Sequence, residues 1–352
     1  MDLLERTTEM VAIPSVSLDE AALADYVERS LPADRLQVIR VGGNVIARSN
    51  LGRGQRVVLA GHLDTVPPNG NAEPRVDGDV LWGVGAADMK AGLAVMIELA
   101  QRVPEPVVDV TWMFYVAEEI EPEHNGLRHL VAHHPELFRA DLAIVGEPTD
   151  GAVEAGCQGS LRVEVRLRGQ RAHTSRPWMG RNAIHRAGRL LTTLDGYEPR
   201  RPVLDGCEFR EAVQVVRIDG GVAGNVVPDE VTVTVNVRYA PDRTADDAVA
   251  ALRTLIADVL EPEDDLELVS DANGAPPATK HPLLRAMRDR HALDVRAKLG
   301  WTDVARFAAL GVPAVNFGPG DPTLAHNADE RVERASLDQV YAALEDLLTN
   351  GA

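Results

Sequence analysis

The stretch from Arg56 to Pro68, RVVLAGHLDTVPP, constrains the fold more than any other part of the chain. Its apolar run Val57–Ala60 is too short for most helices and is β-branched at two positions, which predicts a buried strand in a parallel or mixed sheet. His62 and Asp64 follow at the carboxyl end of this strand, where open α/β sheets place ligand sites. Because they are two residues apart in extended chain, the Asp64 side chain can accept the second ring N–H of His62. An isolated His-x-Asp pair is more often only a polar strand end, so its context matters.

Two further apolar segments also end in carboxylates. The strand predicted over 107–116 is followed by Glu118 and Glu119, and the strand predicted over 143–145 is followed by Glu147. As a surface pair, Glu118 and Glu119 alone would be unremarkable. Carboxylates repeated at the ends of buried strands instead predict a polar site at the edge of the sheet.

The segment GVGAADMK, which begins at Gly83, is a glycine-rich turn leading into a helix that starts near Lys90. Gly83 and Gly85 resemble the beginning of a dinucleotide-binding motif. Asp88, however, occupies the position of the third glycine, and no apolar strand directly precedes the turn. The segment is therefore expected to present Asp88 to the site.

A loop after the predicted strand 313–317 contributes a second histidine. The resulting set has two histidines and three carboxylates, which are His62, Asp88, Glu119, Glu147 and His326. One bridging carboxylate plus one histidine and one carboxylate per metal gives a co-catalytic pair, with ions about 3.5–4 Å apart. Nitrogen and oxygen ligands suit Zn²⁺, with Co²⁺ or Mn²⁺ as substitutes. Glu118, left without a metal, can take a proton from a shared water, which predicts metal-assisted amide hydrolysis.

The chain changes character after residue 160. From there the predicted elements follow the order β-α-β-β-α-β, over residues 161–168, 182–194, 212–218, 231–239, 244–260 and 266–270. This is the split βαβ, ferredoxin-like pattern, and it predicts an inserted α+β domain over 161–270. Residues 1–160 and 271–352 are expected to form one catalytic α/β domain with a mixed, largely parallel sheet.

The composition excludes several classes of partner. The formal net charge of −18 argues against nucleic acid and anionic membranes, but not against a small anionic substrate. No stretch approaches the roughly 18 apolar residues of a membrane span, and the amino terminus lacks the basic and apolar regions of a signal peptide. Two cysteines, Cys157 and Cys207, suggest no disulfide framework. These features predict a cytoplasmic protein.

Seven ordered motifs carry a family resemblance over essentially the whole chain. They are GHLDTVP, GAADMKAG, AEE, GEPT, AHTSRP, GGVAGNVVPD and GPGDPTLAHNADE. The chain resembles the M20 family of dinuclear zinc amidohydrolases and peptidases, and within it most closely the succinyl-diaminopimelate desuccinylases of actinobacterial type. The resemblance implies a zinc-peptidase-like catalytic domain, an inserted lid domain that forms a homodimer, and a cis peptide bond between Asp88 and Met89.

The resemblance also implies a role for each metal ligand. Asp88 would bridge two Zn²⁺ ions. His62 and Glu147 would complete one metal site. Glu119 and His326 would complete the other.

Three further residues receive catalytic roles from the resemblance. Asp64 would orient His62, and Glu118 would act as the general base and then as the general acid. His173 would stabilise the oxyanion, since a positioned donor can hydrogen-bond the developing charge. We expect His173 to reach the active site of the partner protomer, because the domain that carries it is the one expected to dimerise.

The implied reaction is the hydrolysis of N-succinyl-LL-2,6-diaminopimelate to succinate and LL-2,6-diaminopimelate, a step of lysine and peptidoglycan precursor biosynthesis. The implied substrate-binding residues are Arg238, Asn225, Arg306, Thr302 and Asp303. An arginine fork suits a carboxylate. Arg238, at the end of a polar strand, would fit a solvated cation equally well.

One departure from the family pattern leaves the substrate open. Other desuccinylases carry two arginines before the pair that is Gly159-Ser160 here, whereas this chain has Cys157-Gln158. A related enzyme, such as an acetylornithine deacetylase, an aminoacylase or a dipeptidase, is therefore an alternative. A non-catalytic metal-binding protein is another, although Glu118, a base beside a ligand, counts against it.

Overall fold

The computed structural model describes residues 2–352, which divide into two compact units. The first consists of the residues up to Gly156 together with Pro277–Ala297 and Asp303–Ala352. The second consists of Cys157–Pro276 and Lys298–Thr302. The insertion expected over 161–270 falls inside the second unit, whose boundaries extend slightly beyond it on both sides.

The first unit is built on an eight-stranded sheet. Its strands are β1 (Gln37–Val41), β2 (Asn44–Arg48), β3 (Arg56–His62), β6 (Asp109–Tyr115), β7 (Leu142–Val145), β8 (Val153–Ala155), β17 (Val295–Ala297) and β18 (Ala314–Asn316). They lie in the order β1-β2-β6-β3-β7-β18-β8-β17. The pairs β6–β3, β3–β7, β7–β18 and β8–β17 are parallel, and the other three pairs are antiparallel. The expected mixed, largely parallel sheet is confirmed.

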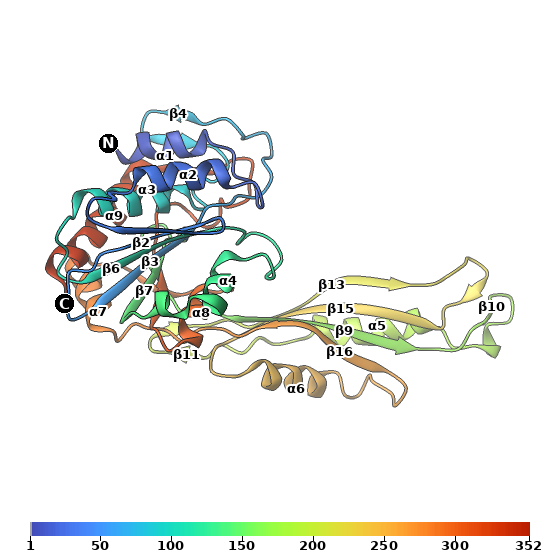
Figure 1. The fold of residues 1–352 in the computed structure, drawn as a ribbon. Coiled ribbons are helices and arrows are strands. Elements are labelled where there is room, and N and C mark those ends of the chain that lie inside the picture. Colours follow the sequence, from blue (N-terminus) through green and yellow to red (C-terminus); the bar gives the residue numbers. More distant parts are fainter. Residues whose placement is uncertain (1) are drawn as a thin grey trace. The chain divides into compact units, whose positions relative to one another are not determined.

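Helices cover both faces of this sheet, so its central strands β3, β6 and β7 are buried along nearly their whole length. The helices are α1 (Leu3–Val11), α2 (Ala21–Ser30), α3 (Lys90–Arg102), α4 (Gly126–His133), the short η1 (Pro135–Phe138), α7 (Pro282–His291), α8 (Val304–Ala309) and α9 (Arg334–Asn350). Helices α1, α3 and α9 lie on one face, and α4 and α8 lie on the other (Figure 1). A Cβ at Gly92 of α3 would lie 2.4 Å from the carbonyl oxygen of Gly146. Glycine therefore lets α3 approach the end of β7 closely.

A small three-stranded sheet lies beside the glycine-rich turn. Its strands are β4 (Arg75–Asp77), β5 (Val80–Trp82) and β19 (Arg331–Glu333), in the order β19-β5-β4. The guanidinium groups of Arg75 and Arg331 lie 4.6 Å and 4.7 Å from the ring centre of Trp82. The sheet thus joins the chain just before Gly83 to the chain just after Glu330.

The second unit is a four-stranded antiparallel sheet packed against two helices. Its main elements are β9 (Gly159–Arg168), α5 (Ala183–Asp195), β13 (Ala212–Gly220), β15 (Glu230–Tyr239), α6 (Ala245–Leu255) and β16 (Asp265–Ala272). The strand order is β13-β15-β9-β16, so the chain follows the expected β-α-β-β-α-β path. Short elements decorate it: β10 (Ala172–His173), η2 (Pro177–Met179), β11 (Val203–Leu204), β12 (Cys207–Glu208) and β14 (Val226–Val227).

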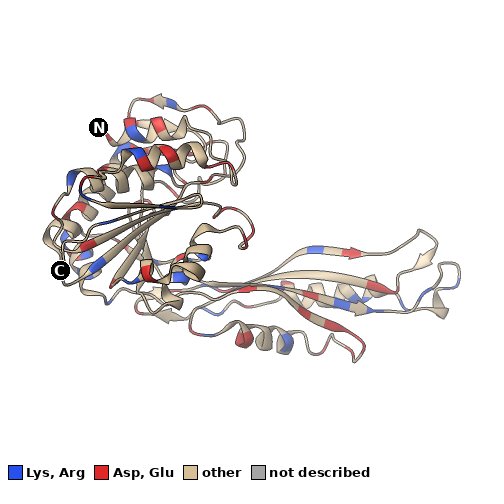
Figure 2. Ribbon diagram, in the orientation of Figure 1, with Lys and Arg blue, Asp and Glu red and all other residues tan. Residues whose placement is uncertain are grey.

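Residue alternation explains the two faces of this second sheet. Val163 and Val165 of β9 and Val233 and Val235 of β15 are buried in one core cluster with residues of both helices. The intervening residues of β9 and β16 include acidic and basic side chains, and Figure 2 shows both signs of charge along these strands. Period-two alternation of this kind is typical of a sheet covered on one face only.

Two observations concern the chain as a whole. Cys157 and Cys207 are both buried, and neither forms a disulfide. Over residues 2–352, no helix combines the length and the apolar character that a membrane span needs.

Candidate metal centre

All five expected metal ligands lie in the first unit, on elements that end at one edge of its sheet. His62 is the last residue of β3, Glu147 follows β7, and Glu119 follows β6. Asp88 belongs to the glycine-rich turn before α3, and its peptide bond to Met89 is cis, as expected. The fifth, His326, stands in the loop between β18 and β19.

Asp88 lies between the two histidines. Its Oδ1 is 3.0 Å from Nε2 of His62, and its Oδ2 is 3.6 Å from Nε2 of His326. Nε2 of His62 is 4.0 Å from Oε1 of Glu147. Nε2 of His326 is 2.8 Å from Oε1 of Glu119. Each oxygen of Asp88 therefore faces a different histidine–carboxylate pair.

The residues present fit a pair of cations that share Asp88. In the groups His62–Asp88–Glu147 and Asp88–Glu119–His326, one ligand atom from each residue lies within 4.8 Å of the others. Each group supplies one imidazole nitrogen and two carboxylates, a donor set suited to Zn²⁺. Asp88 is the only residue that the two groups have in common.

The pKa shifts show how strongly these groups interact. Burial alone would lower the pKa of His62, but hydrogen bonds with Asp64 and Asp88 outweigh it and raise that pKa well above 6.5. Hydrogen bonds with Asp88 and Glu119 raise the pKa of His326 to about 10. Although burial opposes it, the same contacts lower the pKa of Asp88. A bound cation would replace these histidine protons, since metal ligands must be deprotonated.

Glu118 lies beside the cluster in a different environment. Burial raises its pKa well above 4.5, and the nearby charge of Glu147 adds to this effect. One of its carboxylate oxygens comes within 4.8 Å of ligand atoms of His62 and Glu119. A carboxyl group with a raised pKa at such a position has the property needed for proton transfer near neutral pH.

The role expected for Asp64 is only partly observed. Nδ1 of His62 lies 3.0 Å from the main-chain oxygen of Asp64 but 3.5 Å from its Oδ1. The carboxylate instead accepts the main-chain N–H groups of Glu118 at 2.9 Å and Glu119 at 3.0 Å, and the hydroxyl of Ser17 at 2.8 Å. Asp64 lies two residues beyond the end of β3, outside the regular strand in which residues i and i+2 point the same way. Asp64 therefore holds the Glu118–Glu119 segment as well as the histidine ring.

Further polar residues that the sequence did not point to continue this support. Oε1 of Glu20 accepts the main-chain N–H of Ala117 at 3.1 Å, and Oδ1 of Asn44 accepts that of Val116 at 3.1 Å. The four successive main-chain N–H groups of residues 116–119 thus all donate hydrogen bonds to side-chain oxygens. On the other side of the cluster, Oε1 of Glu330 accepts the N–H groups of Ala87 and Asp88, each at 3.0 Å. Glu330 is the last residue of the GPGDPTLAHNADE motif, which gave no sign that its side chain accepts these amides.

His173 and Asn225 belong to the second unit. His173 is exposed on β10, which pairs with β14 directly after Asn225. The main-chain N–H of Ser175 donates to Nδ1 of His173 at 3.1 Å. Because a main-chain N–H can only donate, the neutral His173 ring carries its proton on Nε2. That nitrogen is the one able to donate to a ligand.

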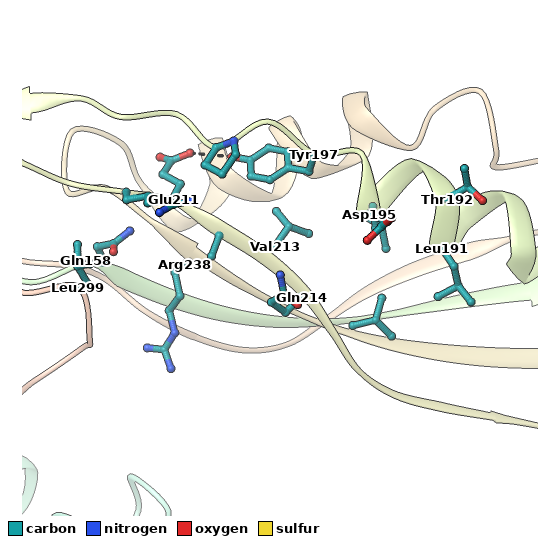
Figure 3. Close-up of a pocket in the computed structure, with 15 residues that line it drawn as sticks. Gln158, Leu191, Thr192, Asp195, Tyr197, Glu211, Val213, Gln214, Arg238 and Leu299 are labelled. Carbon is teal, nitrogen blue, oxygen red and sulfur yellow. Dashed lines mark hydrogen bonds between the residues drawn. The ribbon is translucent and has the colours of Figure 1, made fainter. Parts of the chain in front are cut away.

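Arg238 borders a pocket of about 780 Å³ in the second unit (Figure 3). Within residues 2–352 the side chain of Arg238 has no hydrogen bond or ion pair, and burial lowers the pKa of its guanidinium. Gln158 lines the same pocket, and its buried Nε2 also lacks a hydrogen-bond partner in the described part of the chain. A cation and an amide donor without partners are suited to an anion.

The remaining expected substrate-binding residues are held by neighbours. Arg306 donates through Nε to Oδ1 of Asp303. The buried Asp303 also accepts Nδ2 of Asn125 at 3.1 Å. Thr302 is buried, and its carbonyl oxygen lies 3.7 Å from Sγ of Cys157. At least part of the Arg306 guanidinium is thus engaged within the chain.

The chain is similar to known proteins over nearly its whole length. The model of peptidase family M20/M25/M40 matches residues 58–350. A Mycobacterium tuberculosis protein provisionally named succinyl-diaminopimelate desuccinylase DapE is 50% identical over 334 residues, covering 94% of this chain and 93% of that protein. Succinyl-diaminopimelate desuccinylase of Corynebacterium glutamicum is 40% identical over 357 residues, covering 99% and 96%.

Solved structures show the same fold at low identity. A Staphylococcus aureus tripeptidase superposes with a TM-score of 0.78 at 21% identity, covering 98% of this chain and 96% of that one. The Bacillus subtilis YXEP protein, described as a dinuclear metal binding peptidase, gives 0.72 at 16% identity, covering 98% and 96%. Together with the family match and the curated relatives, these likenesses show that the chain belongs to the M20 family of peptidases.

Proposed function

We propose that this chain is a two-metal amide hydrolase that cleaves N-succinyl-LL-2,6-diaminopimelate to succinate and LL-2,6-diaminopimelate. The observation that carries the reaction type is the pair of ligand groups sharing Asp88, with Glu118 beside them. The names of relatives at 50% and 40% identity, with nearly full coverage of both chains, support this substrate.

The cofactor in this proposal is a pair of Zn²⁺ ions. His62, Asp88 and Glu147 would hold one ion, and Asp88, Glu119 and His326 the other. When bound, the ions would polarise the amide carbonyl and lower the pKa of water. Co²⁺ and Mn²⁺ prefer similar donors and are expected to substitute.

The chain's own residues then carry the protons and position the substrate. Glu118 would accept a proton from the attacking water and pass it to the leaving amine. The Asp64 carboxylate holds the Glu118–Glu119 segment by accepting hydrogen bonds from its two main-chain N–H groups. His173 would donate from Nε2 to the carbonyl oxygen as charge develops there. Arg238 would bind a substrate carboxylate, and Asn225, Arg306, Thr302 and Asp303 would contribute to the pocket.

We further propose that the second unit is a lid through which two copies form a homodimer. In that assembly His173, which is exposed on β10, would serve the partner's active site. This arrangement explains why a histidine with a free donor is presented on an exposed strand rather than buried near the metal ligands.

Metal-dependent turnover tests the proposal. Protein freed of metal and reconstituted with Zn²⁺ is assayed with N-succinyl-LL-2,6-diaminopimelate and with N-acetylornithine, and the Glu118→Gln variant serves as the control. We expect zinc-dependent release of succinate and much slower deacetylation. Faster turnover of N-acetylornithine would move the assignment to another N-acyl amino-acid hydrolase. No zinc-dependent turnover of either amide or of a dipeptide would favour a non-catalytic metal-binding protein.

A further inference from the structure

Glu330 accepts hydrogen bonds from the main-chain N–H groups of the turn that presents Asp88. It is 1% exposed and stands immediately before β19. Its Oε1 accepts the N–H groups of Ala87 and Asp88, each at 3.0 Å, and its carbonyl oxygen accepts the N–H of Gly83 at 3.1 Å. One residue thus binds both the beginning and the end of the turn that presents Asp88.

The same residue is joined to the loop that carries His326. The main-chain N–H of Glu330 donates to the carbonyl oxygen of Asn327 at 3.2 Å. That oxygen also accepts Nδ2 of Asn71 at 3.1 Å, and the carbonyl oxygen of Asn71 accepts the N–H of Val84. Glu330 therefore lies in a short network that connects the chain beside His326 with the chain before Asp88.

The two candidate metal sites differ in what holds their ligands. His62 and Glu147 stand at the ends of β3 and β7, which pair in parallel along Val57–Ala60, and Gly146 donates its N–H to Ala60 at 2.8 Å. Asp88 and His326 stand on loops instead. The sheet positions the first pair, whereas the loops need a separate connection to position the second.

We propose that Glu330 is the positioning residue that holds Asp88 and His326 in the relative positions that metal binding needs. It would thereby determine the affinity of the metal site formed by Asp88, Glu119 and His326. The inference rests on the proposed two-metal function. Buried amides at Ala87 and Asp88 would lose their acceptor without this carboxylate, and the turn would shift to find another. Outer partners of metal ligands typically affect metal affinity by about 10–100-fold.

Matched variants separate this role from a purely structural one. Glu330→Met removes the acceptor, and Glu330→Gln keeps an oxygen that can accept both amides but lacks the charge. Asp109→Asn is the control. Asp109 is also buried and accepts two loop amides, those of Leu51 at 2.8 Å and Arg53 at 2.9 Å. It begins β6, so it lies at the opposite end of that strand from Glu118.

The measurement is calorimetric titration of metal-free protein with Zn²⁺, with thermal unfolding recorded for each variant. We expect two ions in the wild type and in Asp109→Asn, even if that control is less stable. In Glu330→Met both ions should bind more weakly because they share Asp88, with the larger loss, about 10–100-fold, at the ion held by Asp88, Glu119 and His326. Glu330→Gln should weaken the same ion by less than about tenfold.

The outcomes distinguish the assignment of two metal sites from the role of Glu330. A wild type that binds fewer than two ions overturns the metal assignment itself. Two ions with wild-type affinities in Glu330→Met overturn only the role of Glu330. If Glu330→Met does not fold, Glu330→Gln decides, and an unchanged affinity for both ions in that variant contradicts the proposal.

Discussion

In the first unit, buried side-chain oxygens accept hydrogen bonds from the main-chain N–H groups of Asp88 and Glu119, whereas in the second unit His173 and Asn225 are exposed. His173 lies on the two-residue strand β10, and Asn225 directly precedes its partner β14. The charges differ as well. Carboxylates dominate the cluster of the first unit, and an arginine without a carboxylate partner among residues 2–352 borders the pocket of the second.

The difference separates two tasks. Buried, hydrogen-bonded carboxylates are preorganised for cations, so we expect the first unit to contain everything that metal binding needs. Exposed donors and an unpaired guanidinium suit a ligand that arrives later. Variants of the first unit should therefore change metal content or chemistry, and variants of the second should change catalysis without changing metal content.

The largest expected effect concerns Glu118. Glu118→Gln keeps the size of the side chain and removes its proton-accepting charge, so kcat should fall by about 10²–10⁴-fold while both ions stay bound. Steady-state kinetics and elemental analysis measure the two quantities. Glu119→Gln is the matched control, because a carboxamide is a poorer ligand and one ion should be lost. Equal metal loss in both variants would show that the roles of these neighbours are wrongly assigned.

His173 tests the contribution of the second unit to catalysis. Removing one oxyanion donor should lower kcat by about 10²–10³-fold in His173→Ala, with metal content unchanged. His185→Ala, another exposed histidine of the same unit, should leave kcat as it is. When His173→Ala and Glu118→Gln homodimers exchange subunits, activity should return, since one site then has both an intact base and an intact donor. No recovery under demonstrated exchange would place His173 in its own protomer's site or outside catalysis.

Arg238 should affect substrate binding more than chemistry. Losing a charge-assisted hydrogen bond to a carboxylate raises KM by about 10–100-fold, and kcat should change little if the contact is the same in ground and transition states. Arg217→Gln is the control, because Arg217 is exposed and paired with Asp219. Arg238→Gln kinetics that match those of the control would remove Arg238 from the substrate pocket.

The smallest effect is a pH dependence of the metal-free protein. His326 has a pKa of about 10 in the folded state, above its ordinary value of 6.5. Its contribution to stability is therefore fully present below pH 6.5 and is lost as the pH rises through 10. Urea unfolding of the metal-free wild type and of His326→Gln should show a steeper loss of stability between pH 7 and 10 in the wild type. Parallel stability profiles would contradict the ion pairs of His326 with Asp88 and Glu119.

Much of this site could be predicted because its ligands lie where local sequence is informative. His62, Glu119 and Glu147 each lie at or just after the carboxyl end of a largely apolar strand, and such ends are common ligand sites. Asp88 follows a glycine-rich turn that no dinucleotide-binding motif explains. The order of the predicted elements after residue 160 likewise indicated the β-α-β-β-α-β unit.

The supporting contacts could not be predicted in the same way. Glu330 binds amides some 240 positions away in the chain, and Glu20 binds an amide nearly 100 positions away. Such contacts depend on the paths of several loops, for which no periodicity exists. The three-stranded sheet formed by β4, β5 and β19 was not predicted either, because each of its strands has only three residues. Asp64 shows the limit most clearly, because its neighbour His62 was foreseen and its bonds to Glu118 and Glu119 were not.

Anomalous diffraction at the zinc edge, from crystals of active, zinc-saturated protein, would locate the ions relative to Asp88. We predict two peaks about 3.5–4 Å apart. One should lie among His62, Asp88 and Glu147, and the other among Asp88, Glu119 and His326. A single peak in fully active protein, or a second peak away from Asp88, would contradict the shared-carboxylate metal pair.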